Sequence, residues 1–149
     1  MRISIVGLMA ALMCICVSAT PATAQRTPLV QASGDLSVQQ SFMFDLDNGA
    51  VGSGPRADIW FHAVSSTERY LEPQGATLLA AGDGSDRGFA GCAIAQYSAT
   101  RIALANVPIG SFVCVRTGEG RISQFRRTAG VAQDRLTLRF TTWALNPFP

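Results

Sequence analysis

The sequence predicts an all-β fold, a single-domain antiparallel β-sandwich or small barrel of seven to nine short strands. Three observations lead to this prediction. Apolar residues alternate with a period of two rather than the helical period of about 3.6. Turn signals built from glycine and proline recur at intervals of about 8–15 residues, and no segment has a convincing helical pattern. Short alternating strands separated by turns are typical of sandwiches and small barrels.

The first 24 residues have the three parts of a secretory signal peptide. Arg2 gives a basic start, Ile3–Val17 is an uncharged apolar run of 15 residues, and Ala22–Ala24 has the small-residue pattern of a cleavage site. The run is shorter than the roughly 18 residues expected of a membrane-spanning helix. We therefore expect residues 1–24 to be removed, with cleavage after Ala19 as the alternative. The mature protein is then secreted or periplasmic and does not span the membrane.

The remaining chain divides by composition into an arm, a domain and a tail. Residues 25–40 are polar and small and predict a flexible N-terminal arm. Residues 41–144 carry the alternation and predict the β-domain, and residues 145–149 predict an irregular C-terminal tail. A mature chain of this size is about one domain, and folding buries roughly two thirds of its unfolded surface.

The middle of the chain alternates strands, turns and loops. Residues 57–64, with the sequence ADIWFHAV, are predicted to form a strand. Residues 72–75 and 107–110 each place proline second and glycine fourth, which suits a type I turn. Residues 82–88 are rich in glycine and aspartate and predict the most flexible interior loop.

The C-terminal third predicts a hairpin followed by a long strand. Residues 111–117 and 121–126 flank a Gly-Glu-Gly loop, where glycine can adopt the left-handed conformation that a three-residue hairpin loop requires. The pairing then places Val113 and Phe125 opposite each other on the core side. The opposite face is mixed, so we expect it to be partly covered. Residues 135–143 alternate apolar and polar side chains over their whole length.

Two cysteines remain after removal of the signal peptide, Cys92 and Cys114. An exported chain with two cysteines usually pairs them. The predicted disulfide closes a loop of 22 positions, which is worth roughly 3 kcal/mol in the chain-entropy model. The alternative, a reactive thiol acting with His62, is disfavoured by an oxidising compartment.

Positive charge is carried by arginine alone and is concentrated near the C-terminus. The absence of lysine excludes a lysine base, a lysine Schiff base and a P-loop lysine. Residues 25–109 hold five arginines and eight acidic residues (−3), whereas residues 110–149 hold six arginines and two acidic residues (+4). This asymmetry indicates an anionic partner for the C-terminal third, or an internal match between the two halves. The candidate anion-binding residues are Arg116, Arg121, Arg126, Arg127, Arg135 and Arg139, and the candidate aromatic contacts are Trp60 and Trp143.

Catalytic, metal and cofactor sites are not predicted. His62 is the only histidine, no serine has the Gly-x-Ser-x-Gly spacing, and a zinc site cannot be assembled from one histidine and two paired cysteines. Residues 45–49, Asp-Leu-Asp-Asn-Gly, resemble part of a calcium loop. However, glycine stands fifth rather than sixth, and Arg56 stands where the loop needs glutamate. Ordinary turn chemistry explains these carboxylates, so we predict neither a metal nor a cofactor.

Several segments together resemble a group of uncharacterised small exported bacterial β-domains. They are ADIWF, YLEPQGA, GCAIAQYS and FVCVRTGEGRISQF, followed by LTLRFTTW, within residues 42–143. The resemblance implies an exported all-β module and transfers no activity, cofactor or catalytic residue.

The functional hypothesis that follows is a non-enzymatic exported module that acts by surface binding. Its partner is expected to be an anionic polymer of the cell envelope or another exported protein, since nucleic acid is a poor partner in that compartment. The alternative is a small secreted hydrolase that uses His62 as its base.

Overall fold

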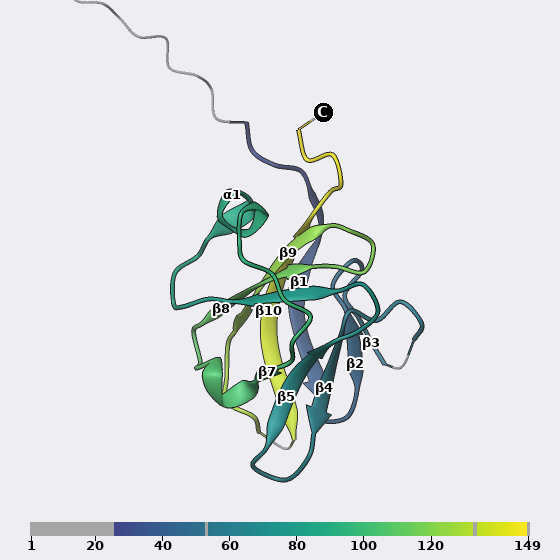
Figure 1. The fold of residues 1–149 in the computed structure, drawn as a ribbon, viewed down its shortest axis with the longest axis vertical. Coiled ribbons are helices and arrows are strands. Elements are labelled where there is room, and N and C mark those ends of the chain that lie inside the picture. Colours follow the sequence, from purple (N-terminus) through teal and green to yellow (C-terminus); the bar gives the residue numbers. More distant parts are fainter. Residues whose placement is uncertain (1–25, 53, 133, 149) are drawn as a thin grey trace, which may run out of the picture.

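Two antiparallel β-sheets of five strands each make up the fold of the described residues (Figure 1). The computed structural model describes residues 26–52, 54–132 and 134–148, and the predicted signal peptide, residues 1–24, lies outside them. The predicted all-β sandwich class is therefore confirmed, with ten strands among the described residues instead of seven to nine.

The first sheet has the strand order β1-β10-β9-β8-β6. Its strands are β1 (Val30–Gln39), β6 (Leu78–Ala81), β8 (Phe112–Arg116), β9 (Ile122–Arg127) and β10 (Arg135–Trp143). The predicted hairpin register is confirmed, because Val113 pairs with Phe125 and Val115 with Ser123. The bounds of β10 are those predicted from the alternation.

The second sheet has the strand order β3-β2-β4-β5-β7. Its strands are β2 (Met43–Asp45), β3 (Ala50–Val51), β4 (Ile59–Ala63), β5 (Arg69–Pro73) and β7 (Ile102–Ala103). A 3-10 helix, η1 (Leu104–Asn106), follows β7 directly. The strands of this sheet are short, so the ends of the sheet are built mainly from the loops between them.

The core lies between the two sheets. Along β10, Leu136, Leu138 and Phe140 are buried, as the period of two predicts. Phe44 of the second sheet meets Phe125 of the first edge to face, with ring centroids 6.4 Å apart. Contact of this kind between large rings adds to the stabilisation that burial itself provides.

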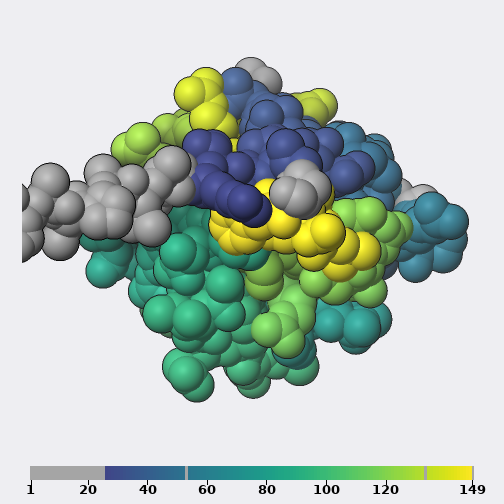
Figure 2. Space-filling view, turned by 90° about the horizontal axis from the view of Figure 1, so that it is seen from above, coloured from purple at the N-terminus to yellow at the C-terminus, as the bar shows by residue number. Residues whose placement is uncertain are grey.

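Strand β1 corrects the expectation of a flexible arm over residues 25–40. It pairs with β10 along its whole length, with Leu36 opposite Leu138 and Val38 opposite Leu136. Figure 2 shows this N-terminal segment (purple) lying against the C-terminal segment (yellow). The first half of β1 is small and polar, so it has little strand pattern of its own. Its backbone is held by a strand that lies about a hundred residues away in the sequence.

A short helix, α1 (Gly88–Ala93), was not expected in this region. It has six residues, too few for a helical period to show in the sequence. Helix α1 packs on the outer face of the hairpin, where Cys92 is disulfide-bonded to Cys114. The predicted disulfide and the predicted partial cover of that face are both confirmed, and the bond is compatible with an oxidising compartment. No helix of the described residues has the length and apolar character needed to cross a membrane.

Candidate functional site

The six arginines proposed from the sequence do not lie on one face. Four are exposed and belong to outward-facing positions of the first sheet, on the side opposite the core: Arg116, Arg126, Arg135 and Arg139. We call these four residues the arginine face. The other two, Arg121 and Arg127, are partly buried and bond inside the domain.

Arg127 is held by backbone carbonyls. Its guanidinium donates to the carbonyl oxygens of Leu104, at 3.3 Å, and Val107, at 2.7 Å, next to helix η1. Burial lowers the pKa of the Arg127 guanidinium. The side chain therefore anchors a loop and is a poor candidate for contact with a partner.

Arg126 and Arg139 are direct cross-strand neighbours on β9 and β10. Like charges directly opposite each other are unfavourable unless other groups compensate them. Arg139 makes a two-point contact with Asp35, at 2.8 and 3.0 Å, and this hydrogen bonding holds the pKa of Asp35 below its usual value. Arg126 lies over the ring of Phe112, with 5.6 Å to the ring centroid, and donates to the carbonyl of Gly110 at 3.3 Å.

A small hollow of about 200 Å³ lies beside these two arginines. It is lined by Asp86, Phe112, Gln124, Arg126, Arg139, Phe140 and Thr141. The carboxylate of Asp86 already accepts hydrogen bonds from Gln124, at 2.8 Å, and from the backbone of Gly88, at 2.9 Å. Arg116 extends the face onto β8, where its guanidinium lies 5.2 Å from the ring centroid of Tyr97.

The two candidate aromatic contacts, Trp60 and Trp143, differ in how far they are buried. Trp143 is only 7% exposed and packs edge to face against Phe89, at 5.7 Å between ring centroids. Trp143 is therefore a poor candidate for contact with a partner, because Phe89 of helix α1 covers it at the end of β10. Trp60 is half-buried and stacks flat on His62, with 3.9 Å between ring centroids.

His62 has a carboxylate partner on the neighbouring strand. Its Nδ1 atom lies 2.9 Å from Oε2 of Glu72, and both side chains are partly exposed. In the described part of the chain, no hydroxyl or thiol group is hydrogen-bonded to the imidazole ring. His62 could therefore act as a base that Glu72 orients, but no nucleophile of the described residues is in hydrogen-bond contact with it.

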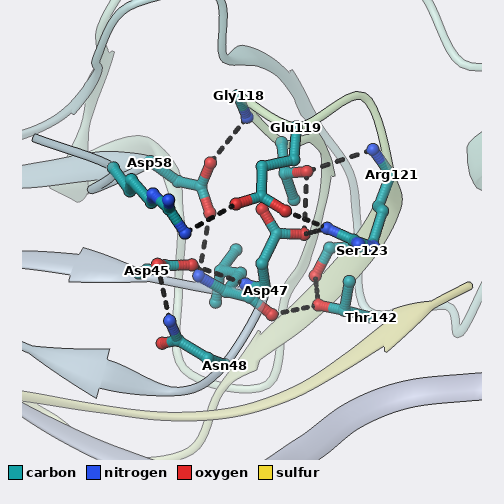
Figure 3. Close-up of polar contacts among 12 residues, drawn as sticks. Asp45, Asp47, Asn48, Asp58, Gly118, Glu119, Arg121, Ser123 and Thr142 are labelled. Atoms are coloured by element: carbon teal, nitrogen blue, oxygen red, sulfur yellow. Dashed lines mark hydrogen bonds and ion pairs between the residues drawn. The ribbon is translucent and has the colours of Figure 1, made fainter. Parts of the chain in front are cut away.

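Three aspartates converge at one end of the second sheet (Figure 3). Asp45 and Asp47 lie at the end of β2 and just after it, and Asp58 lies just before β4, the antiparallel neighbour of β2. One oxygen of each carboxylate lies within 4.8 Å of the others, and all three residues are buried. We call these three residues the aspartate cluster. The sequence pattern explains Asp45 and Asp47 as turn residues. Asp58 comes close to them only because β2 pairs with β4.

Hydrogen bonds fix two of these carboxylates. Asp58 accepts from the backbone N–H groups of Leu46, at 2.8 Å, and Gly118, at 2.7 Å, and from the hydroxyl of Thr77 at 3.1 Å. Even so, burial raises the pKa of Asp58 to about 6. Asp45 accepts from its own turn, including the backbone N–H two residues later at 2.7 Å.

Asp47 is the least satisfied member of the aspartate cluster. Its Oδ1 atom accepts from the hydroxyl of Thr117, at 3.0 Å, and lies 3.2 Å from the guanidinium of Arg121. Its Oδ2 atom is buried without a hydrogen-bond partner in the described structure. Burial is the main cause that raises the pKa of Asp47.

No protein-family model matches this chain, and neither a curated protein nor a solved structure matches it. The resemblance to exported bacterial β-domains therefore stays a prediction from the sequence.

Proposed function

We propose that this protein is an exported, non-enzymatic β-domain that binds an anionic polymer of the cell envelope through the arginine face. The observation that carries the proposal is the direct cross-strand pairing of Arg126 with Arg139 beside a hollow of about 200 Å³. Two neighbouring guanidinium groups form a natural receptor for a carboxylate or phosphate, because each presents several N–H donors in a planar fork.

The donors of these arginines are only partly used. A guanidinium has five N–H donors, and Arg139 uses two of its nitrogen atoms on Asp35. Arg126 makes one hydrogen bond to a backbone carbonyl. Both side chains are exposed, so an incoming anion can reach the remaining donors without unfolding any part of the sheet.

The spread of the arginine face favours a polymer over a single ion. Its members lie on three adjacent strands, β8, β9 and β10, which are spaced about 4.8 Å apart. Arg135 and Arg139 are four residues apart on β10 and are therefore separated by roughly 13 Å along the strand. A chain with repeated negative groups can contact several of these positions at once, which raises avidity.

Export is supported by the predicted signal peptide and by the Cys92–Cys114 disulfide. Disulfides persist in secreted and periplasmic proteins and are rare in the cytosol. Uronic chains, teichoic chains and lipopolysaccharide are anionic polymers that an exported domain can meet.

The test uses the double variant Arg126→Gln/Arg139→Gln on immobilised polygalacturonate, in a buffer with EDTA to prevent calcium cross-linking of the polymer. The matched control is Arg56→Gln/Arg101→Gln, which removes the same charge from exposed positions outside the arginine face. We expect the first variant to elute at clearly lower salt, with an affinity loss of about tenfold from two charge-assisted contacts. Equal elution of the two variants would contradict the proposal.

A second candidate function, a secreted hydrolase with His62 as base, is favoured only by the contact between His62 and Glu72. His62→Ala should leave hydrolysis of ester, peptide and glycan substrates at background level, as in the wild type. Any hydrolytic activity of the wild type that His62→Ala abolishes would favour this second function over binding.

A further inference from the structure

The aspartate cluster carries more negative charge than its neighbours neutralise. The three aspartates and Glu119 contribute four carboxylates, whereas the guanidinium groups paired with them are those of Arg56 and Arg121. Four negative charges against two positive charges leave a formal charge of −2. Arg56 contributes weakly, because its side chain is 80% exposed and lies 3.9 Å from Glu119. Buried like charges are costly without a compensating positive charge.

The unpartnered oxygen of Asp47 is a second and independent observation. The side chain of Asp47 is only 5% exposed, yet its Oδ2 atom has no hydrogen-bond donor in the described residues. Buried polar atoms nearly always have a hydrogen-bond partner. Burying an atom of a charged group without a partner costs more free energy than burying a neutral polar atom. Arg121 bonds Oδ1, and its own Nε atom is also buried without a partner, so this arginine does not satisfy Oδ2.

We infer that the aspartate cluster binds a divalent cation, and that this cation is calcium. One oxygen of each of the three carboxylates lies within 4.8 Å of the others. This spacing admits the calcium–oxygen distances of about 2.3–2.6 Å, and calcium takes several carboxylate ligands in a flexible geometry, whereas magnesium usually keeps several waters and binds only one or two carboxylates. The donors are all carboxylate oxygens without histidine or cysteine, which is the donor set of a hard cation and not of zinc.

The existing hydrogen bonds orient the carboxylates without exhausting them. Each carboxylate oxygen has two lone pairs and can therefore accept a hydrogen bond and also bind a cation. In Asp45, Oδ1 accepts one hydrogen bond from the backbone of Asp47, and Oδ2 accepts one from the side-chain amide of Asn48. A hollow of about 400 Å³, lined in part by Asp45 and Asn48, opens beside the cluster. Calcium takes about six to eight oxygen ligands. The protein would supply roughly half of them, and water entering through this hollow would supply the rest.

The cation would connect segments that are far apart in the sequence. Asp45 and Asp47 belong to the end of β2, Asp58 leads into β4, and Gly118 and Arg121 bring in the β8–β9 hairpin of the other sheet. A ligand that binds only the folded state stabilises it in proportion to its free concentration. Calcium should therefore raise the melting temperature of the protein. This inference does not depend on polymer binding by the arginine face.

The experiment uses the mature chain with its disulfide intact, freed of metal with EDTA and titrated with CaCl₂, with MgCl₂ in parallel. We expect one saturable calcium site by calorimetry, with a Kd of about 0.1–1 mM as in extracellular modules. The melting temperature should rise by about 5 °C or more at 10 mM CaCl₂, and by less with MgCl₂. No saturable binding up to 10 mM CaCl₂, or an equal response to both ions, would overturn the inference.

Asp47→Asn is the decisive variant because it keeps every hydrogen bond that Asp47 makes. The amide oxygen can replace Oδ1, and the amide nitrogen then stands where Oδ2 has no partner. Calcium affinity should fall at least tenfold, while the metal-free variant should melt no lower than the wild type. The control Asp35→Asn removes the same charge from an exposed pair and should bind calcium as the wild type does. Unchanged affinity in Asp47→Asn would place the calcium elsewhere and refute this site.

Discussion

The arginine face and the aspartate cluster are both concentrations of like charge, but they differ in their exposure to water. Arg126 and Arg139 are exposed neighbours on the outside of the first sheet. Asp45, Asp47 and Asp58 are buried at the end of the second sheet. Water and salt screen the exposed charges, so their repulsion costs little. The buried charges lack that screening and must be compensated by hydrogen bonds, by Arg121 or by a cation.

This difference separates two roles that arginine has in the same molecule. Exposed arginines can be lost with little effect on folding, and their loss should be seen in binding. Arg121 and Arg127 are bonded to internal groups, and their loss should be seen in stability.

Arg121→Gln should lower the free energy of unfolding by about 2 kcal/mol, because it leaves the buried Asp47 without its cationic partner. Arg126→Gln, which removes an exposed arginine of the same hairpin, should change stability by less than about 0.5 kcal/mol. Urea denaturation at pH 7 in the presence of EDTA measures both. Similar destabilisation by the two variants would erase the distinction between the exposed and the internal arginines.

The titration of Tyr97, whose ring lies under the guanidinium of Arg116, allows a test of stability against pH on the outer side of the first sheet. Burial raises the pKa of Tyr97 to about 12 in the folded protein, whereas an unfolded tyrosine titrates near 10. The folded state therefore holds this proton more tightly, and stability should fall as the pH rises from about 10 to 12. The loss should be about 1 kcal/mol at pH 11 and absent in Tyr97→Phe. Parallel unfolding curves at pH 9 and pH 11 check it, and an equal pH effect in both proteins would contradict it.

Asp35→Asn should strengthen polymer binding modestly. It removes one of the two oxygen atoms that accept hydrogen bonds from Arg139, and it removes a competing negative charge. We expect a two- to threefold gain in affinity for polygalacturonate, about 0.5 kcal/mol, with little change in melting temperature because exposed pairs contribute little. The salt concentration needed for elution measures the gain. A weaker retention than that of the wild type would show that Asp35 positions Arg139 for binding.

Local patterning was enough to predict much of the first sheet. The hairpin register and the bounds of β10 follow from alternation and a glycine-rich loop, and the disulfide follows from the number of cysteines that the predicted signal peptide leaves in the chain. Strand β1 and helix α1 could not be predicted in this way. The first half of β1 takes its structure from pairing with β10, and α1 is held through Cys92, so neither has a pattern of its own.

The candidate sites were predictable only where one strand carries them. Arg135 and Arg139 share a face because they lie an even number of residues apart on β10. The alternation around Phe125 places Arg126 on the outer face and Arg127 on the core side, but the carbonyl groups that hold Arg127 near helix η1 come from another segment and could not be predicted locally. The approach of Asp58 to Asp47 likewise depends on the pairing of β2 with β4, a contact that a turn pattern does not reveal.

Specific binding by the arginine face can be measured as the salt concentration at which Arg126→Gln/Arg139→Gln elutes from polygalacturonate, with the wild type and Arg56→Gln/Arg101→Gln run beside it. We expect the first variant to elute well before the control, although both have lost two positive charges. Co-elution of the two variants would show that net charge alone determines retention. The arginine face would then have no specific role.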